Sequence, residues 1–333
     1  MAGVLNIWEY CSSYQEPEDF DDFWTSTIAE ARRHELVLKI EPVETYLVTV
    51  EVFDVTFPGF GGHPIRALLR LPQHCKGKLP AVVQFHGYSG GRGAAMEDLL
   101  WSSAGYAHLY MDVRGQGGDW TSGHTPVPVG SRPAYPGFLT KGIENRDDYF
   151  YRRVYTDAVR AVDTVRSLDF VDPERVAVIG NSQGAGIALA AAGLVPDLAA
   201  AHFQAPFLAD IQQATRTVRA FAYEEITKYL AARRDSADRV WQTLAYFDGI
   251  AFARRAQAPA WFSAGQLDDV VPAHAVFGAY HEYRGPKQIR LWEHNGHEAG
   301  GAEDLAIALS AFAKVLGPGS PTYPGSPTDT RNS

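Results

Sequence analysis

The segment Gly180-Asn181-Ser182-Gln183-Gly184 has the spacing G-x-S-x-G, which places a serine between two glycines. In this spacing a strand turns sharply into a helix, so the serine backbone is strained and its hydroxyl is exposed as a nucleophile. The glycines let the strand and the helix approach without a clash between side chains. The flanking residues fit, because 175–180 (RVAVIG) favours a strand and 184–194 (GAGIALAAAGL) favours a helix of small residues. Ser182 is therefore the candidate nucleophile.

Two other interpretations of this motif are a plain strand-to-helix turn and a phosphate-binding loop. A dinucleotide-binding loop needs G-x-G-x-x-G directly after the first strand and an acidic residue about 20 positions later. The chain lacks that order. The plain turn is left as the alternative to a nucleophile.

A serine hydroxyl becomes a good nucleophile when a histidine accepts its proton and a carboxylate orients that histidine. Around a G-x-S-x-G serine, the three residues follow one another in the order Ser, Asp or Glu, His. Downstream, 258–265 (APAWFSAG) favours a strand that is followed by Asp268, and 287–294 (KQIRLWEH) favours a strand that is followed by His297. Asp268 and His297 therefore fit both the order and the topology.

Neighbouring residues are competitors for these two roles. Asp269 lies in the same loop as the candidate acid and would point elsewhere, and His294 lies at the end of a strand, where we expect it to cap or pack. His274 and His281 fall in a helical segment, and we expect both on the surface. Glu298 follows the candidate base, and we expect it to form local hydrogen bonds or to start a helix rather than to donate a proton.

The oxygen of a tetrahedral acyl intermediate needs two hydrogen-bond donors. One is expected to be the backbone N–H of the residue after the nucleophile, which is Gln183. The other comes from the loop after an early strand, and residues 85–91 (FHGYSGG) have the His-Gly start and further glycines typical of that loop. We assign the N–H of Tyr88, within one residue either way. The alternative for this segment is an ordinary tight turn.

The elements that must position these residues follow from hydrophobic patterning. Residues 17–35 favour an amphipathic helix, and 45–56 and 64–72 favour two strands of an antiparallel hairpin around a glycine-rich turn. Short apolar runs then alternate with helical segments, which predicts a mainly parallel sheet with right-handed crossovers. The further strands are expected in 80–87, 106–115, 175–180, 199–207, 258–265 and 287–294, and the further helices near 95–104 and in 151–168, 184–194, 209–256, 272–283 and 301–316. The predicted fold class is α/β, an α/β-hydrolase fold whose mostly parallel central sheet is flanked by helices.

We predict one α/β-hydrolase domain over 1–317, because no repeat or linker divides the chain. Residues 116–150 contain many Gly, Pro and Asp residues with little periodicity. An insertion of that length usually has a function or makes contacts, so we expect a long inserted loop of this kind at 116–150. The tail at 318–333 is rich in Pro, Ser, Thr and Gly and is predicted to be disordered.

Composition excludes several classes of partner. The 333 residues carry a formal net charge of −9, which argues against nucleic acid and anionic membranes, since both require basic patches. Cys11 and Cys75 are expected to be unpaired, and they form no disulfide framework or metal motif. Acyl transfer by a serine, a histidine and an aspartate needs no metal or organic cofactor, so we predict neither. The N-terminal residues lack the basic and apolar regions of a signal peptide, and no run approaches the roughly 20 apolar residues of a membrane span. A cytoplasmic protein acting on a small, neutral substrate is predicted.

The chain resembles the acetyl xylan esterase and cephalosporin C deacetylase family, carbohydrate esterase family seven, over about residues 17–316. Three signatures carry the resemblance, namely Arg114-Gly115-Gln116, Gly180-Asn181-Ser182-Gln183-Gly184 and His297-Glu298. Longer matching stretches stand beside them at 85–93, 135–143, 150–162, 247–255 and 276–290. Asn181 in place of a more usual glycine and the altered position of leucine in 266–269 are small departures, and they concern substrate preference rather than chemistry.

The resemblance implies a serine esterase that removes acetyl groups from short xylo-oligosaccharides and from small acetyl esters such as cephalosporin C. It supports Ser182, Asp268 and His297 as the triad and Tyr88 and Gln183 as oxyanion donors. It also implies a homo-hexamer, a trimer of dimers, in which the inserted loop 116–150 contacts another subunit. Arg114 and Gln116 would then hold the loops near the site. The alternatives are an acyl hydrolase or peptidase of different acyl specificity and, outside enzymes, a non-catalytic α/β-hydrolase that binds a partner.

Overall fold

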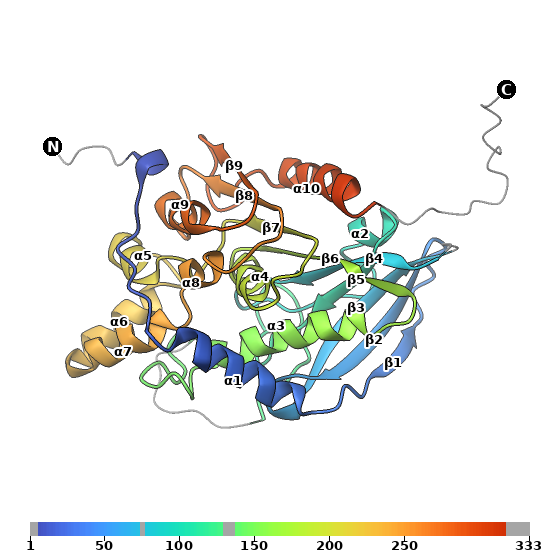
Figure 1. Cartoon of the computed structure of the whole chain (residues 1–333), viewed down its shortest axis with the longest axis horizontal. Helices are drawn as coiled ribbons and strands as arrows, with labels where there is room; N and C mark the ends of the chain where they lie inside the picture. The colour runs from blue at the N-terminus through green and yellow to red at the C-terminus, as the bar shows by residue number, and fades with distance from the viewer. Residues whose placement is uncertain (1–5, 74–76, 129–136, 318–333) are drawn as a thin grey trace.

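The computed structural model describes residues 6–73, 77–128 and 137–317. They contain one nine-stranded sheet with the order β1-β2-β3-β5-β4-β6-β7-β8-β9 (Figure 1). The strands are β1 (Lys39–Val43), β2 (Val50–Pro58), β3 (Pro64–Pro72), β4 (Leu79–Phe85), β5 (Ala107–Met111), β6 (Val171–Asn181), β7 (Ala200–Gln204), β8 (Ala260–Gly265) and β9 (Lys287–Trp292). The first three pair antiparallel with their neighbours, and the pairs from β5 to β9 are all parallel. The predicted hairpin and mainly parallel sheet are therefore confirmed.

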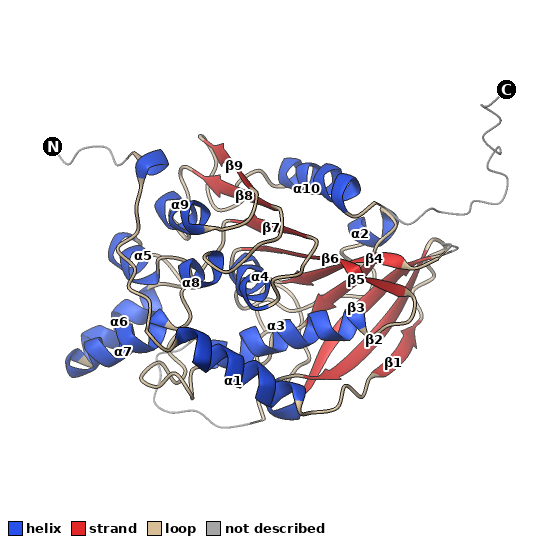
Figure 2. Cartoon of the chain, in the orientation of Figure 1, coloured by secondary structure: helices blue, strands red, loops and turns tan. Residues whose placement is uncertain are grey.

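Helices cover both faces of the parallel part of the sheet (Figure 2). They are α1 (Phe20–Arg32), α2 (Leu100–Ser103), α3 (Phe150–Arg166), α4 (Gln183–Leu194), α5 (Ile211–Thr217), α6 (Glu224–Ala232), α7 (Ala237–Ala245), α8 (Gly249–Ala253), α9 (Ala273–Glu282) and α10 (Ala302–Val315). Successive strand residues point to opposite faces: Val83 of β4 joins the core with α1, α3, α4, α8 and α9, whereas Val82 joins a smaller core with Trp101 of α2 and Phe312 of α10. Burial on both faces explains the continuous apolar runs of these strands.

Helices α3 and α4 pack against the core through close contacts between small residues as well as through buried apolar side chains. On α3, Val154, Ala158, Val162 and Val165 are all buried, so the predicted apolar face of this helix is the one that contacts the core. On α4 the small side chains allow close packing, because a Cβ at Gly193 would lie 2.7 Å from the backbone oxygen of Phe252 in α8. The helix that begins at the candidate nucleophile is thus fixed on the sheet and on its neighbours.

Four predicted element boundaries need correction. The expected strand at 45–56 begins only at Val50, and the separate strand Lys39–Val43 was not predicted. This strand is at the edge of the sheet and mostly exposed, which is where a strand tolerates its Pro42. The helix expected near 95–104 is reduced to α2. The helical segment 209–256 contains four α-helices and the 3-10 helix Arg234–Ser236 rather than one continuous helix. The last α-helix starts where the Asp248 side chain accepts the N–H of Ile250.

Within the inserted segment, the described residues 116–128 and 137–149 form turns and one isolated bridge, Gly118 to Ser122, with no helix or strand. The Asp112 carboxylate anchors the first part by accepting the N–H groups of His124 and Thr125. Residues 129–136, Cys75 and the tail predicted to be disordered lie outside the described residues, and Cys11 is a free, exposed thiol.

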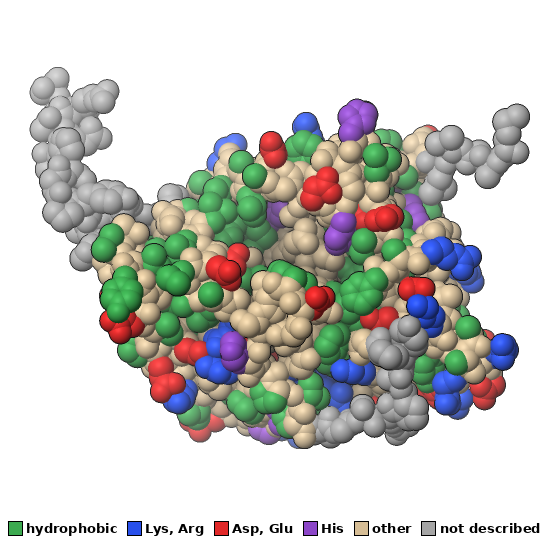
Figure 3. Space-filling view, turned by 180° about the vertical axis from the view of Figure 1, so that it is seen from behind, with side chains coloured by type: hydrophobic (Ala, Val, Ile, Leu, Met, Phe, Trp, Pro, Cys, Tyr) green, Lys and Arg blue, Asp and Glu red, His purple; other side chains and the backbone are tan. Residues whose placement is uncertain are grey.

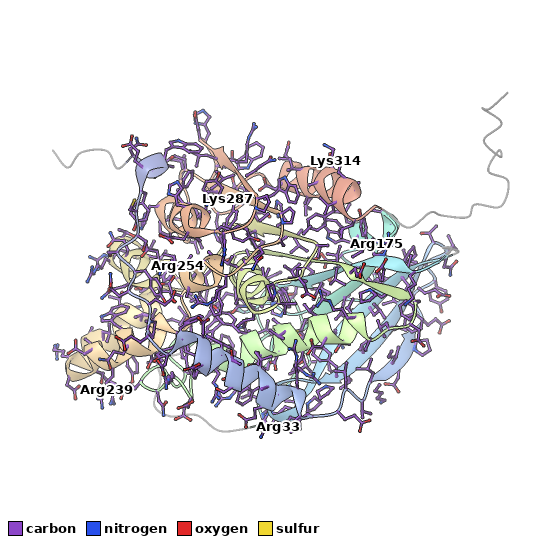
Figure 4. All side chains as sticks on the ribbon, viewed as in Figure 1. Arg33, Arg175, Arg239, Arg254, Lys287 and Lys314 are labelled. Atoms are coloured by element: carbon purple, nitrogen blue, oxygen red, sulfur yellow. The ribbon has the colours of Figure 1, made fainter. Side chains whose placement is uncertain are left out.

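The surface mixes charges of both signs. Basic residues lie on several elements, among them Arg33, Arg175, Arg239, Arg254, Lys287 and Lys314 (Figure 4). Seen from behind, acidic and basic side chains are interspersed with apolar ones (Figure 3). None of the helices in the described ranges combines the length and apolar character needed to cross a bilayer.

Candidate active site

The candidate nucleophile lies at the turn between β6 and α4. Ser182 has φ 54° and ψ −122°, a conformation that L-residues rarely adopt. The turn is closed by glycines, because a Cβ at Gly180 would lie 2.1 Å from the carbonyl carbon of Gly184. A Cβ at Gly184 would in turn lie 2.0 Å from the carbonyl oxygen of Phe85 at the end of β4. The structure thus has the strand–turn–helix context that the motif predicts. A larger residue at either glycine would push α4 away from the strands β6 and β4.

The backbone of Ser182 is held on both sides while its side chain is left free. Its N–H donates to the carbonyl oxygen of Gln204 at 2.9 Å, and its own carbonyl accepts the N–H of Phe207 at 3.1 Å and of Gly186 at 3.0 Å. Among the described residues, none forms a hydrogen bond with the Ser182 hydroxyl. The side chain is only 7% exposed, so the turn presents one unpaired hydroxyl in a confined place.

Asp268 and His297 come together from the loops after β8 and β9. The Nδ1 atom of His297 lies 2.8 Å from Oδ2 of Asp268. The other carboxylate oxygen, Oδ1, accepts the N–H groups of Val270 and Val271, each at 2.8 Å. Asp268 is buried, whereas the imidazole is about one third exposed. The carboxylate is therefore fixed through both oxygens and can orient the ring, which leaves Nε2 as the nitrogen available to a proton.

Gln204, the last residue of β7, connects the histidine loop to the serine turn. Its carbonyl accepts the Ser182 N–H, and its side-chain Nε2 donates to the carbonyl oxygen of Glu298 at 2.6 Å. Ser182 and His297 form no direct hydrogen bond with each other, and the two loops are connected through the hydrogen bonds of Gln204. Sequence reasoning missed Gln204, because a glutamine at a strand end has no motif of its own.

The competing residues lie apart from this arrangement, and one expectation about them was wrong. Asp269 and His294 are exposed. Glu298 accepts from Asn295 Nδ2 at 2.9 Å and from the Gly296 N–H at 3.3 Å, which is the predicted local hydrogen bonding. His274 was expected on the surface, but it is buried, with its ring 5.3 Å from that of Tyr10.

The reason for the error at His274 is a contact distant in sequence. The N-terminal segment that carries Tyr10 covers α9, and the phenol of Tyr10 also bonds Asp210. Burial lowers the pKa of His274. His281, about two turns further along the same helix, is half-buried, with Nδ1 2.8 Å from the Tyr10 carbonyl oxygen. Both histidines therefore support packing of the N-terminal segment.

Two backbone N–H groups near Ser182 are free to bind an oxyanion. Gln183 is the first residue of α4, so its N–H has no intrahelical acceptor. The N–H of Tyr88 has no acceptor among the described residues. The close approach of Gly184 to Phe85 places the start of α4 directly against the end of β4, from which the Tyr88 loop begins. Gln183 and Tyr88 are the two oxyanion donors predicted from the sequence, and this role stays a prediction.

Tyr88 is fixed through its side chain and its carbonyl group. Its phenol lies 2.8 Å from Oε1 of Glu225 and accepts the N–H groups of Phe138 at 2.6 Å and Leu139 at 3.0 Å. Its carbonyl oxygen accepts Nε1–H of Trp120 at 2.8 Å. Burial raises the pKa of the Glu225 carboxyl to about 7 and also raises the pKa of the Tyr88 phenol. Sequence analysis missed Glu225, because nothing in its helix distinguishes a buried glutamate from its exposed neighbours.

Arg114 and Gln116 support the site without facing the serine. Arg114 is buried and binds Asp157 of α3 through Nε and Nη2, each at 2.7 Å. The Gln116 side chain donates to Oε1 of Gln183 at 2.8 Å and accepts the N–H of Ser89 at 2.9 Å. It thereby connects the nucleophile turn to the Tyr88 loop, which is the structural role implied by the family resemblance.

Asp304 of α10, which sequence analysis also missed, holds the histidine loop from behind. Its carboxylate is buried and accepts the Gly300 N–H at 2.8 Å, three residues after His297. It also accepts the hydroxyl of Ser263 in β8 at 2.5 Å and Nε1–H of Trp292 in β9 at 3.0 Å. One carboxylate thus joins the two strands whose loops supply the aspartate and the histidine.

Comparison with known proteins places these features in context. The family model described as Acetyl xylan esterase (AXE1) matches residues 4–311. Acetyl esterase Axe7A of Xylanibacter ruminicola is 28% identical over 291 residues, which cover 85% of this chain and 64% of that protein. The chain therefore spans less than two thirds of the length of this curated relative.

Two solved structures are similar over nearly their whole length. An acetyl xylan esterase from a Paenibacillus species is 35% identical with a TM-score of 0.85, covering 93% of this chain and 98% of that one. Acetyl xylan esterase 1 from a Thermoanaerobacterium species is 30% identical with a TM-score of 0.84, covering 92% and 97% respectively. This likeness confirms the predicted α/β-hydrolase fold.

Proposed function

Because the chain belongs to the acetyl xylan esterase family, a family of carboxylic ester hydrolases, we propose that it is a serine esterase acting on acetyl groups. Its substrates are acetylated xylo-oligosaccharides and small acetyl esters such as cephalosporin C, and the reaction passes through an acetyl-enzyme intermediate. No metal or organic cofactor takes part in this proposal. The acetyl specificity is supported by the similarity of the chain to an acetyl esterase and to two acetyl xylan esterases of known structure.

One observation carries the proposal, namely the 2.8 Å contact between His297 Nδ1 and the buried Asp268 carboxylate beside the Ser182 turn. A carboxylate on Nδ1 keeps the proton there, so Nε2 is the basic nitrogen. The unpaired hydroxyl and the two free N–H groups of Tyr88 and Gln183 supply the nucleophile and the oxyanion donors. A binding protein has no need to keep all of these groups.

In the first step, the Ser182 Oγ attacks the acetyl carbonyl carbon while His297 Nε2 accepts the hydroxyl proton. The carbonyl electron pair moves onto oxygen, where the N–H groups of Tyr88 and Gln183 stabilise the negative charge. Asp268 stabilises the imidazolium without taking its proton. When the tetrahedral intermediate collapses, the ester C–O bond breaks, the alcohol leaves with the proton from His297, and an acetyl group remains on Ser182.

In the second step, a water molecule replaces the alcohol. His297 accepts a proton from the water as its oxygen attacks the acetyl-enzyme carbonyl, and the same two N–H groups bind the oxyanion again. Collapse of this intermediate breaks the bond to Ser182 Oγ, which recovers the proton from His297. Acetate is released, and the free enzyme is regenerated with every proton accounted for.

The test is release of acetate from acetylated xylo-oligosaccharides, cephalosporin C and p-nitrophenyl acetate by the wild type and by Ser182→Ala. We expect the variant to lose at least about a thousandfold in kcat and to keep the wild-type melting temperature. Ser26→Ala on the exposed side of α1 is the matched control and should keep full activity. Turnover retained in Ser182→Ala would remove this residue from the proposed role.

Acyl specificity needs a separate experiment. Butyryl and octanoyl esters and an aminoacyl amide are to be compared with the acetyl ester at the same alcohol or chromophore. A clear preference for acetyl in kcat/KM supports the proposal, whereas equal or better turnover of longer acyl groups or of the amide would favour a broader acyl hydrolase or a peptidase.

Assembly and location also stay proposals. We propose a homo-hexamer, a trimer of dimers, in which the inserted segment 116–150 contacts a neighbouring subunit. Light scattering on the purified chain would give the mass of the assembly, and a monomer would contradict the proposal. The cytoplasmic location predicted from the sequence is to be tested by cell fractionation.

A further inference from the structure

Three segments that are distant in sequence meet at the buried carboxylate of Glu225 in α6. They are the loop after β4 with Tyr88, the inserted segment with Phe138 and Leu139, and α6 itself. We propose that Glu225 is a positioning residue, which locks the loop carrying the Tyr88 oxyanion donor to the inserted segment. This inference rests on the proposed function for its catalytic consequence, but not for its geometry.

The lock is the set of hydrogen bonds among Tyr88, Glu225 and residues 138–139, and the phenol of Tyr88 is its central group. It donates to Oε1 of Glu225 at 2.8 Å and accepts the N–H groups of Phe138 and Leu139 at 2.6 and 3.0 Å. Both oxygen lone pairs and the single proton of the phenol are thereby used. The position of the ring, and with it the position of the Tyr88 backbone, is fixed from three directions.

Glu225 supplies two acceptors, and both are occupied. Oε1 accepts the phenol proton, and Oε2 accepts the Leu139 N–H at 3.1 Å. A glutamine of the same shape has only one acceptor atom, so its NH₂ group would face either the phenol or the Leu139 N–H, donor against donor. The geometry therefore distinguishes a carboxylate from an amide at this position.

The space around the carboxylate is shaped for it. Gly137 has φ 132°, and a Cβ there would lie 2.1 Å from the Glu225 carboxyl carbon and from Oε1. The side chain is only 2% exposed. Lys141, whose ammonium lies 4.1 Å from the Phe138 ring centre, provides the nearby positive charge, and Tyr149 and Tyr151 are further titratable neighbours. Burying a carboxyl group costs free energy, so a buried carboxyl such as that of Glu225 is expected to have a defined role.

The lock has a consequence for the reaction because the Tyr88 N–H is aimed at charge that exists only in the transition state. Displacing such a donor slows the chemical step more than it weakens substrate binding. At pH 8.5, above the pKa of about 7 to which burial raises the Glu225 carboxyl, the side chain is a carboxylate. At that pH, Glu225→Gln should lower kcat for p-nitrophenyl acetate by about tenfold, with KM changed by less than about twofold. Glu224→Gln, on the neighbouring residue whose carboxylate pairs with Lys228 at the surface, is the matched control and should behave like the wild type.

A double-mutant cycle with Tyr88→Phe tests the route of the effect. If Glu225 acts through the phenol, Glu225→Gln should cost much less in the Tyr88→Phe background than alone. A full tenfold loss in both backgrounds, or wild-type kcat in Glu225→Gln, would overturn the proposal.

Hydrogen exchange provides a readout that does not depend on activity. In Glu225→Gln, amides in 86–93 and in 137–143 should exchange about tenfold faster than in the wild type, while α9 stays unchanged. Unchanged exchange in both segments would overturn the lock even if kcat fell. If the wild type released no acetate, the proposed function would fail, and the exchange result would still decide the role of Glu225.

Discussion

At the residue scale, two adjacent aspartates in one loop illustrate how burial assigns chemistry. Asp268 is buried with both oxygens engaged, one by His297 and the other by the N–H groups of Val270 and Val271. Asp269, the next residue, is exposed. Charge alone does not separate them, because they carry the same carboxylate. Only Asp268 can orient an imidazole.

We predict that Asp268→Asn lowers kcat by about a thousandfold or more. The amide can place its NH₂ group against His297 Nδ1, which favours the tautomer whose Nε2 carries the proton and cannot accept another. KM for p-nitrophenyl acetate should change little, since the carboxylate does not touch the substrate. Steady-state kinetics check the prediction, with Asp269→Asn as the control. Equal losses in the two variants would contradict it.

The sequence predicts catalytic residues better than the residues that support them. Ser182, Asp268 and His297 are predicted as the triad because chain order and strand ends constrain where such side chains lie, and the structure shows the contact between His297 and Asp268. Gln204 and Glu225 act through contacts with segments 94 and 137 residues away, such as Gln204 with Glu298 and Glu225 with Tyr88. No local pattern encodes such a contact.

At the element scale, β8, β9 and α10 are joined by a polar cluster inside the sheet. Asp304 accepts hydrogen bonds from Ser263, Trp292 and Gly300. His202 of β7 lies nearby, and burial lowers its pKa to about 4, so it stays neutral near pH 7. The cluster therefore fixes the strand ends from which the acid and base loops begin.

We predict that Asp304→Asn lowers the free energy of unfolding by about 2 kcal/mol, because an amide cannot accept on both sides and leaves a buried donor unpaired. Urea unfolding measures the loss as a lower midpoint at an unchanged m-value. The control is Glu303→Gln, whose side chain is exposed at the first turn of the same helix. A variant as stable as this control would show that the cluster contributes nothing.

Element types were predicted well where both faces of a strand or one face of a long helix is buried, as in β4 and α3. The errors fall where burial is weak or broken. The strand Lys39–Val43 is mostly exposed and contains Pro42, so neither hydrophobic period nor β-propensity marks it. The region 209–256 is interrupted at several points, and Asp248 caps the last of its helices.

At the scale of the whole molecule, two buried acids make stability depend on pH. Burial raises the pKa of Asp248 from 3.8 to about 7 and the pKa of Glu225 from 4.5 to about 7. Between the pKa of the unfolded state and about pH 7, each of these two carboxyl groups is protonated in the folded protein and ionised in the unfolded protein. The contribution of each acid to stability is therefore complete below its unfolded pKa and is lost as the pH rises to about 7.

The variant Asp248→Asn isolates this effect from the other titrating groups. Asp248 accepts the N–H groups of Asp210, Ile211 and Ile250, so we expect the wild type to be more stable than the variant at pH 5. We predict that this difference in free energy of unfolding shrinks between pH 5 and pH 8, since only the wild type then buries a charge. Urea titrations of both proteins at the two pH values check it. A difference that is constant or grows with pH would contradict the prediction.

The global arrangement was predictable in outline, because alternating strands and helices allow few topologies. What could not be predicted is how the N-terminal segment closes over α9 and buries His274, since that contact joins residues 10 and 274. The role of 116–150 between subunits stays a prediction.

The double contact of Gln204 also sets an order on folding. The serine turn takes its anchor from β7, 22 residues later in the chain, and the histidine loop takes its anchor from the same residue across 94 positions. Neither loop reaches its working geometry before β6 and β7 have paired and the last strands have docked beside them. Esterase activity during refolding should therefore return only after the far-ultraviolet circular dichroism signal of secondary structure. Turnover would then report that the strands in the middle of the sheet have all paired.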